Sequence, residues 1–138
     1  MTRNKDTKTQ FDSEKWTSDP HAGSNINEYN AQSIMKIEYP TIYNGYLQIM
    51  DEQFELFCKK HLDYGMGNIS QGTNLDTEDE KKFALSGLFF RMNDKINRWK
   101  NLIISNRKAN NETLIDTYQD LTNYGIISQL VERDMWRK

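Results

Sequence analysis

Apolar side chains recur at three- and four-residue steps in three long segments of the chain, which is the spacing of amphipathic helices. The first predicted helix runs from about Thr41 to Leu62. Pro40 marks its start, because proline is tolerated in a first helical turn and disfavoured further inside. Gly65 marks its end, because glycine readily takes the left-handed conformation that closes a helix. Its apolar face comprises Tyr46, Ile49, Met50, Phe54, Phe57 and His61.

Two further helices are predicted after a loop at residues 65–78 that is rich in Gly, Asn and Ser. Thr77 and Glu80 have the spacing of a capping box, and the helix that they open should continue to about Ser105. The third helix should run from about Glu112 to Arg133, with Asn111 as its N-cap. The apolar face of the second helix comprises Leu88, Phe89, Met92, Ile96, Trp99 and Ile103.

The segment before these helices has a different pattern. Residues 1–36 are polar and aperiodic, which predicts an arm that is partly ordered at most, docked through Phe11 and Trp16. Residues 37–138 should form the helical domain. We therefore predict an all-α fold, a small bundle of three long helices plus this arm. Because the third helix is apolar nearly all round beyond Leu121, a homodimer that buries this end is expected.

Composition narrows the class of protein. The 138 residues carry 18 basic and 20 acidic side chains, a formal charge of −2, which disfavours a duplex-DNA binder. The mean hydropathy of −0.88 and the absence of a long apolar run predict no membrane span, and the polar amino terminus predicts no secretory signal. A single cysteine, Cys58, is typical of a reducing compartment, so a cytoplasmic protein is expected.

Charged side chains are sorted into stripes on the predicted helices. On the second helix a basic stripe flanks the apolar face, and Asp94 lies about 60° further round. On the third helix an acidic stripe continues into Ile127 and Leu130, so its members should face protein or a cleft. Glu52 and Glu55 form a pair on the first helix. The basic stripe is Arg91, Lys95 and Arg98. The acidic stripe is Glu112, Asp116 and Asp120, and Asn123 continues it.

Two interpretations of these stripes remain open. Carboxylates at such spacing on facing helices would hold Mg²⁺, with the basic stripe neutralising phosphate. Alternatively, the acidic and basic stripes pair with each other and have no further role. Near the end of the first helix, Asp63, Tyr64 and Asn68 would form a substrate loop, in which Tyr64 stacks on a base. Tyr124 is a second candidate for base stacking, and capping or core packing is the alternative for both tyrosines.

Three stretches together resemble a known family. They are Lys59-Lys60-His61-Leu62-Asp63-Tyr64-Gly65 with Asn68, then residues 87–102 with the segment RMNDKINR, and Glu112 to Tyr124 followed by Gly-Ile-Ile. Their order and spacing are similar to the nucleotide modification associated domain 1 family, found mainly in phages and bacteria. The resemblance covers roughly residues 45–135 and implies a connection with nucleotide or DNA modification.

The helical layout of that family is in turn similar to the all-α NTP pyrophosphatases of the MazG and dimeric dUTPase kind. The resemblance implies that Glu52 and Glu55 form one metal-binding pair and that Asp116 and Asp120 form the other. Glu112 or Asp94 would be an additional ligand. The second pair departs from the pattern, since its members are four residues apart where those enzymes have three.

These observations lead to one principal expectation and two alternatives. The first is a Mg²⁺-dependent nucleotide pyrophosphohydrolase or phosphohydrolase, in which the four carboxylates act catalytically and Arg91, Lys95 and Arg98 contact phosphates. The second is a non-catalytic nucleotide-binding module that sequesters a host nucleotide signal, in the host cytoplasm if the protein is phage-encoded. The third is a structural subunit of a DNA-modification system.

Overall fold

The computed structural model describes residues 26–138, and their side chains from residue 31 onward. The expected docking of Phe11 and Trp16 lies outside this part of the chain. The described residues form helices and connecting loops without any strand, so the all-α prediction is confirmed. None of these helices combines the length and the apolar character needed to cross a membrane. The helices are α3 (Ile26–Glu38), α4 (Pro40–Tyr64), α5 (Gly67–Ser70), α6 (Glu78–Ser105) and α7 (Leu114–Glu132).

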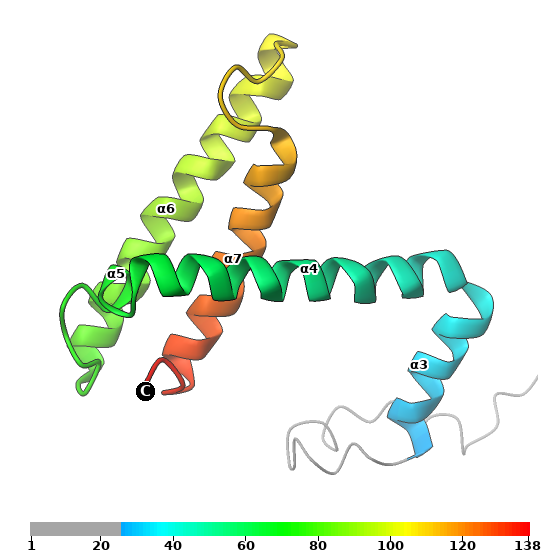
Figure 1. Cartoon of the computed structure of the whole chain (residues 1–138), viewed down its shortest axis with the longest axis horizontal. Helices are drawn as coiled ribbons and strands as arrows, with labels where there is room; N and C mark the ends of the chain where they lie inside the picture. The colour runs from blue at the N-terminus through cyan, green and yellow to red at the C-terminus, as the bar shows by residue number, and fades with distance from the viewer. Residues whose placement is uncertain (1–25) are drawn as a thin grey trace, which may run out of the picture. The chain divides into compact units, whose positions relative to one another are not determined.

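The chain divides into two compact units, Met1–Asp51 and Glu52–Lys138. In the first unit, α3 covers residues that were expected to belong to an aperiodic arm. In the second unit, α6 and α7 run side by side in opposite directions (Figure 1). The last part of α4 and the short helix α5 also belong to this second unit, which holds the core and the candidate site.

Local signals in the sequence account for the helix ends. Pro40 begins α4 as predicted, and Gly65, with φ of +70°, follows its last residue. Thr77 and Glu80 form the predicted capping box of α6. The expected N-cap of α7 is wrong by two residues: Thr113 caps this helix, not Asn111. Asp116 accepts a hydrogen bond from the Thr113 amide at 2.7 Å. Thr113 and Asp116 therefore form a capping box, which Asn111 would not form with Asp116.

The core of the second unit is small and lies where α5, the first half of α6 and the second half of α7 meet. Leu88 and Val131 are its most completely buried large side chains. Phe57 and Tyr124 pack against it from α4 and α7. By contrast, several residues on the predicted apolar face of α6 are exposed, including Phe89, with 62% of its surface open. The buried apolar residues that form this core are Ile69, Leu75, Ala84, Leu88, Ile127, Val131 and Trp136.

Candidate functional site

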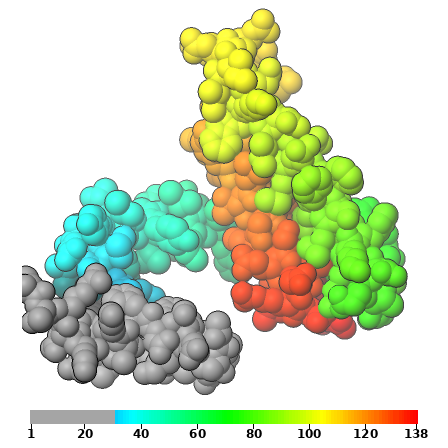
Figure 2. Space-filling view, turned by 180° about the vertical axis from the view of Figure 1, so that it is seen from behind, coloured from blue at the N-terminus to red at the C-terminus, as the bar shows by residue number. Residues whose placement is uncertain are grey.

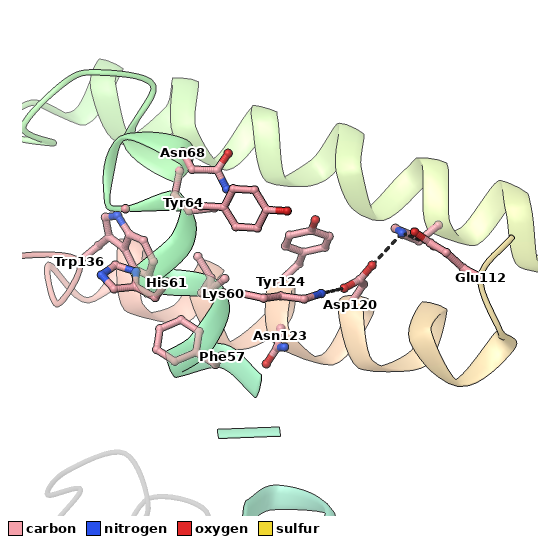
Figure 3. Close-up of a pocket in the computed structure, with 14 residues that line it drawn as sticks. Phe57, Lys60, His61, Tyr64, Asn68, Glu112, Asp120, Asn123, Tyr124 and Trp136 are labelled. Carbon is pink, nitrogen blue, oxygen red and sulfur yellow. Dashed lines mark hydrogen bonds and ion pairs between the residues drawn. The ribbon is translucent and has the colours of Figure 1, made fainter. Parts of the chain in front are cut away.

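A pocket of about 270 Å³ lies beside this core, between the end of α4, the α5 segment, α6 and α7. All of its lining residues belong to the second unit, and Figure 3 shows them as sticks. One end is aromatic and the other carries charged side chains. The lining residues are Phe57, Lys60, His61, Tyr64, Gly65, Asn68, Ile69, Lys95, Glu112, Asp120, Asn123, Tyr124, Ile127 and Trp136.

One face of α4 supplies four of these side chains. Phe57, Lys60, His61 and Tyr64 stand at positions i, i+3, i+4 and i+7, which places them on one side of a helix. The amide of Gly65 donates to the carbonyl of His61 at 2.8 Å and completes the last turn. The end of α4 therefore places Lys60 between aromatic side chains, and the helix ends directly after them.

The aromatic end of the pocket is a cluster of three rings. Phe57 and His61 stack with centroids 5.7 Å apart, and both meet the ring of Trp136 edge-on, at 6.2 and 5.1 Å. The indole Nε1 of Trp136 donates to the carbonyl of Met66 at 3.2 Å. These contacts hold the C-terminal segment against α4 and give the pocket a wall of aromatic ring surfaces.

The charged end of the pocket is organised by Asp120. This residue is 9% exposed, and its carboxylate oxygens accept hydrogen bonds from Lys60 and Lys95, both at 2.7 Å. Lys95 also pairs with Glu112 at 3.0 Å. Burial alone would raise the pKa of Asp120, but the hydrogen bonds and positive charges of the two lysines outweigh burial and lower it. The pKa of Lys95 is raised, mainly by its hydrogen bond to Asp120.

These ion pairs bear on the two interpretations of the charged stripes, metal binding or mutual pairing. The basic stripe of α6 and the acidic stripe of α7 pair with each other at Lys95, Glu112 and Asp120. Lys60, which sequence reasoning missed as a site residue, adds a second positive charge from α4. The spacing of Lys60 with Phe57, His61 and Tyr64 could have indicated from the sequence that Lys60 shares a helix face with them.

The predicted metal ligands are not gathered at one point. Among residues 26–138, no three His, Cys, Asp or Glu side chains lie together so that they could hold a metal ion. Glu55 is exposed and pairs with Lys59 at 2.8 Å, and Glu52 is exposed on the same helix. Asp116 caps its own helix, and Asp94 is exposed on α6. Among the described residues these carboxylates therefore do not form one cluster: Glu112 and Asp120 share Lys95, whereas Glu55 and Asp116 have other local partners.

The predicted nucleotide contacts divide into two groups. Lys95, Tyr64, Asn68 and Tyr124 line the pocket, whereas Asp63 is exposed and does not. The other two basic residues, Arg91 and Arg98, do not line the pocket and form hydrogen bonds elsewhere in the protein.

Arg91 donates to the backbone carbonyl and the side-chain Oδ1 of Asn68, at 2.8 and 3.1 Å. Arg98 donates to the carbonyls of Glu112 and Thr113 and to the hydroxyl of Thr117, which fixes the start of α7 against α6. Arg91 therefore acts on the pocket through Asn68, and Arg98 stabilises the α6–α7 pair.

Asn123 has an unusual position in the pocket wall. It is 6% exposed, and its Nδ2 atom has no hydrogen-bond partner among the residues that the structure describes. A buried donor without an acceptor costs about 1–3 kcal/mol. Gln53, on the facing part of α4, donates to the carbonyl of Gln119 at 2.9 Å, while its Oε1 also finds no partner in the described part of the chain. A ligand acceptor that reached the pocket wall would satisfy the Asn123 amide.

Comparisons with protein-family models, with curated proteins and with solved structures find no match to this chain. The chemistry of the pocket is therefore the basis for any functional conclusion.

Asp116 provides a test that separates a capping role from a ligand role. Its pKa is lowered by hydrogen bonds from the side chain and the backbone of Thr113. Asp116→Ala should destabilise the fold, because α7 loses one of the two bonds of its capping box, and should leave ligand affinity unchanged. Urea unfolding of this variant and of Thr113→Ala should give similar losses. A large loss of binding with unchanged stability would contradict the capping role.

Proposed function

We propose that this chain binds a nucleotide or a nucleotide-like anion in the pocket between α4, α6 and α7, without catalysing its hydrolysis. The observation that carries the proposal is the combination of aromatic rings at one end of the pocket with two lysines at the other (Figure 3). A nucleotide has the same two parts, a planar base and an anionic phosphate. Bases stack on aromatic rings, and lysine binds phosphate as a point charge.

Lys60 is the proposed phosphate contact. An ammonium group has three N–H donors, and one of those of Lys60 is directed to Asp120 at 2.7 Å. Its side chain is 44% exposed, whereas that of Lys95 is 20% exposed and bonds two carboxylates. Lys60 therefore has donors left for a phosphate at the pocket mouth, while Lys95 sets the position of Asp120.

The base would lie against the tyrosines and meet the amides. Tyr64 and Tyr124 line the pocket between its aromatic and charged ends. Arg91 donates a hydrogen bond to the Oδ1 atom of Asn68. The Nδ2 group of Asn68 would therefore contact the edge of the base. The unpartnered Nδ2 of Asn123 supplies a second donor. Two amide donors favour a base with carbonyl or ring-nitrogen acceptors.

The placement of the carboxylates favours binding over the hydrolase expected from the sequence. Asp120 neutralises two lysines and Asp116 caps α7, so neither is arranged as one of a pair of metal ligands. Tight binding without turnover is what sequestration of a nucleotide signal requires. We also propose that the chain forms a homodimer in the cytoplasm, a proposal supported by the large apolar side chains that α6 and α7 expose.

Titration of the full chain with nucleotides tests the ligand. Mono- and triphosphates of the common ribo- and deoxynucleosides should bind more tightly than the matching nucleosides or inorganic phosphate. Lys60→Ala should weaken binding by about tenfold or more, since a charge-assisted hydrogen bond contributes about 1.5–3 kcal/mol. Isothermal titration calorimetry gives both affinities.

Lys59→Ala is the matched control. It removes a neighbouring lysine that pairs with Glu55 at 2.8 Å and does not line the pocket, so it should bind as the unmodified chain does. Equal losses in the two variants, or no binding of any nucleotide at millimolar concentration, would refute the ligand proposal and leave the structural-subunit alternative. Mg²⁺-dependent release of pyrophosphate that both Asp116→Ala and Asp120→Ala abolish would instead support the hydrolase.

A further inference from the structure

Arg91 fixes the orientation of the Asn68 side chain. The short helix α5, which contains Asn68, packs against the first half of α6 (Figure 2), and Arg91 reaches it from there. The guanidinium group of Arg91 donates to the backbone carbonyl of Asn68 at 2.8 Å and to its Oδ1 at 3.1 Å. A guanidinium group has donors and no acceptor, so the amide cannot turn its Nδ2 group toward Arg91 without losing this bond. Arg91 therefore determines which end of the amide a ligand meets.

The end that remains for a ligand is the Nδ2 donor. Asn68 lines the pocket, and in Figure 3 the nitrogen end of its amide is turned toward Tyr64 and the oxygen end away from it. An asparagine with both ends available recognises adenine in a bidentate way, because Oδ1 accepts from the exocyclic amino group while Nδ2 donates to N7. Arg91 occupies the Oδ1 end of Asn68, so only the donor half of that pair is left.

The other amide of the pocket wall also offers a donor. The Nδ2 atom of Asn123 is buried and has no partner among the described residues. The carboxylates at the charged end are engaged, since Asp120 accepts from Lys60 and Lys95. Glu112 pairs with Lys95 as well. Two donors match the edge of guanine or hypoxanthine, where O6 and N7 are both acceptors, whereas adenine has a donor beside an acceptor at the same edge.

We infer that the pocket selects a 6-oxopurine, guanine or hypoxanthine, over adenine, and that Arg91 is the positioning residue that sets this preference. The O6 and N7 atoms of the base accept hydrogen bonds from the amides of Asn68 and Asn123. Adenine places its amino group against a donor, and an unpaired donor in the pocket weakens binding about tenfold or more. The inference rests on the proposed nucleotide binding and adds the identity of the base.

Isothermal titration calorimetry of the full chain with the 5′-monophosphates of inosine and adenosine tests the preference. The two ligands have the same sugar and phosphate and differ only at C6 and in the proton on N1. We expect the inosine nucleotide to bind about tenfold more tightly or better, and the guanosine nucleotide to bind like it. Lys60→Ala should weaken the inosine and adenosine nucleotides by the same factor, because it removes the phosphate contact and no base contact.

Arg91→Ala tests the positioning role. It frees the Oδ1 atom of Asn68 to accept from the adenine amino group, so the ratio of the inosine to the adenosine affinity should fall toward one. Arg91→Lys keeps a donor for Oδ1 and should retain the preference. The matched control is Arg107→Ala, which removes an exposed arginine that does not line the pocket and should leave the ratio unchanged. Circular dichroism reports whether each variant keeps its helices.

Asn68→Asp tests the same contact with Arg91 in place. The carboxylate still accepts from Arg91, and its second oxygen replaces the Nδ2 donor by an acceptor. The preference should therefore reverse, with the adenosine nucleotide bound more tightly than the inosine nucleotide. This variant keeps the inference testable if Arg91→Ala does not fold.

Two results would overturn the inference and leave nucleotide binding intact. Equal affinity of the wild-type chain for the inosine and adenosine nucleotides would show that the amides do not distinguish the bases. A preference for inosine that Arg91→Ala and Asn68→Asp both leave unchanged, with their helices retained, would show that another group recognises the base. Failure of the wild-type chain to bind either nucleotide at millimolar concentration would refute the proposed function itself, and the base preference with it.

Discussion

Replacing Asp120 by asparagine is expected to destabilise the protein by about 2–3 kcal/mol at neutral pH. The substitution keeps the size of the side chain but leaves Lys60 and Lys95 without the carboxylate that both contact at 2.7 Å. Breaking a fully buried ion pair costs about 3–5 kcal/mol. The expected loss is smaller here because the Lys60 side chain is 44% exposed and solvent screens it.

The effect should depend on pH in a defined direction. The pKa of Asp120 is lower in the folded protein than its unfolded value of about 3.9, so the unfolded chain takes up this proton first as the pH falls. The stabilisation by Asp120 is therefore complete well above pH 4 and disappears as the pH falls through the lowered pKa. The difference in unfolding free energy between the wild type and Asp120→Asn should shrink over the same interval.

Urea unfolding at several pH values between 7 and 2 measures this difference. Asp63→Asn is the control, because Asp63 is an exposed carboxylate at the end of α4 and should change stability by less than about 0.5 kcal/mol. A difference for Asp120→Asn that stays constant from pH 7 to pH 2 would show that the ion pairs contribute nothing. A gain in stability would show that desolvation of the carboxylate outweighs its two partners.

The fold was largely predictable from the sequence because its signals are local. Pro40, Gly65 and the Thr77–Glu80 capping box depend on neighbouring residues alone, and all three lie where the pattern indicated. The N-cap of α7 was misplaced because two candidates, Asn111 and Thr113, lie within one turn. The reciprocal bond between Thr113 and Asp116 decides between them.

The candidate site was predictable only in part, because it depends on which helix faces meet. A helical wheel places Lys95 and Asp120 on their own helices, and the packing of α6 against α7 joins them. It gives no indication that Lys60 would reach the same carboxylate from α4, or that Trp136 would close the aromatic end of the pocket. In the same way, a helical wheel does not show whether carboxylates on different helices come together, and among the described residues no three of them do.

The α6 face shows how periodicity and burial differ. Spacing marked Phe89, Ile96 and Ile103 as apolar face residues, yet all three are exposed while Leu88 is buried. The pattern identifies a face that needs covering, and it does not say whether the cover comes from the same chain. Within the described residues, α7 packs on the Leu88 side of α6 and leaves Phe89, Ile96 and Ile103 exposed.

Trp136→Ala is expected to have the largest effect on stability, about 3–5 kcal/mol. The side chain is 6% exposed, and its removal leaves a cavity beside Phe57 and His61. Aromatic pairs contribute about 0.5–1.5 kcal/mol beyond the area that they bury. The carbonyl of Met66 also loses the donor that reaches it at 3.2 Å. The C-terminal segment should then detach from the end of α4.

The matched control is Met135→Ala, which truncates a neighbouring side chain that is 61% exposed and should cost little. Trp136→Phe should recover part of the loss, because it fills most of the cavity but cannot donate to Met66. Thermal unfolding orders the three variants, and calorimetric titration with a nucleotide measures the pocket. If Trp136→Ala were no less stable than Met135→Ala, the aromatic cluster would not be part of the core. If it unfolded more readily but kept full nucleotide affinity, Trp136 would hold the fold together without forming a wall of the binding site.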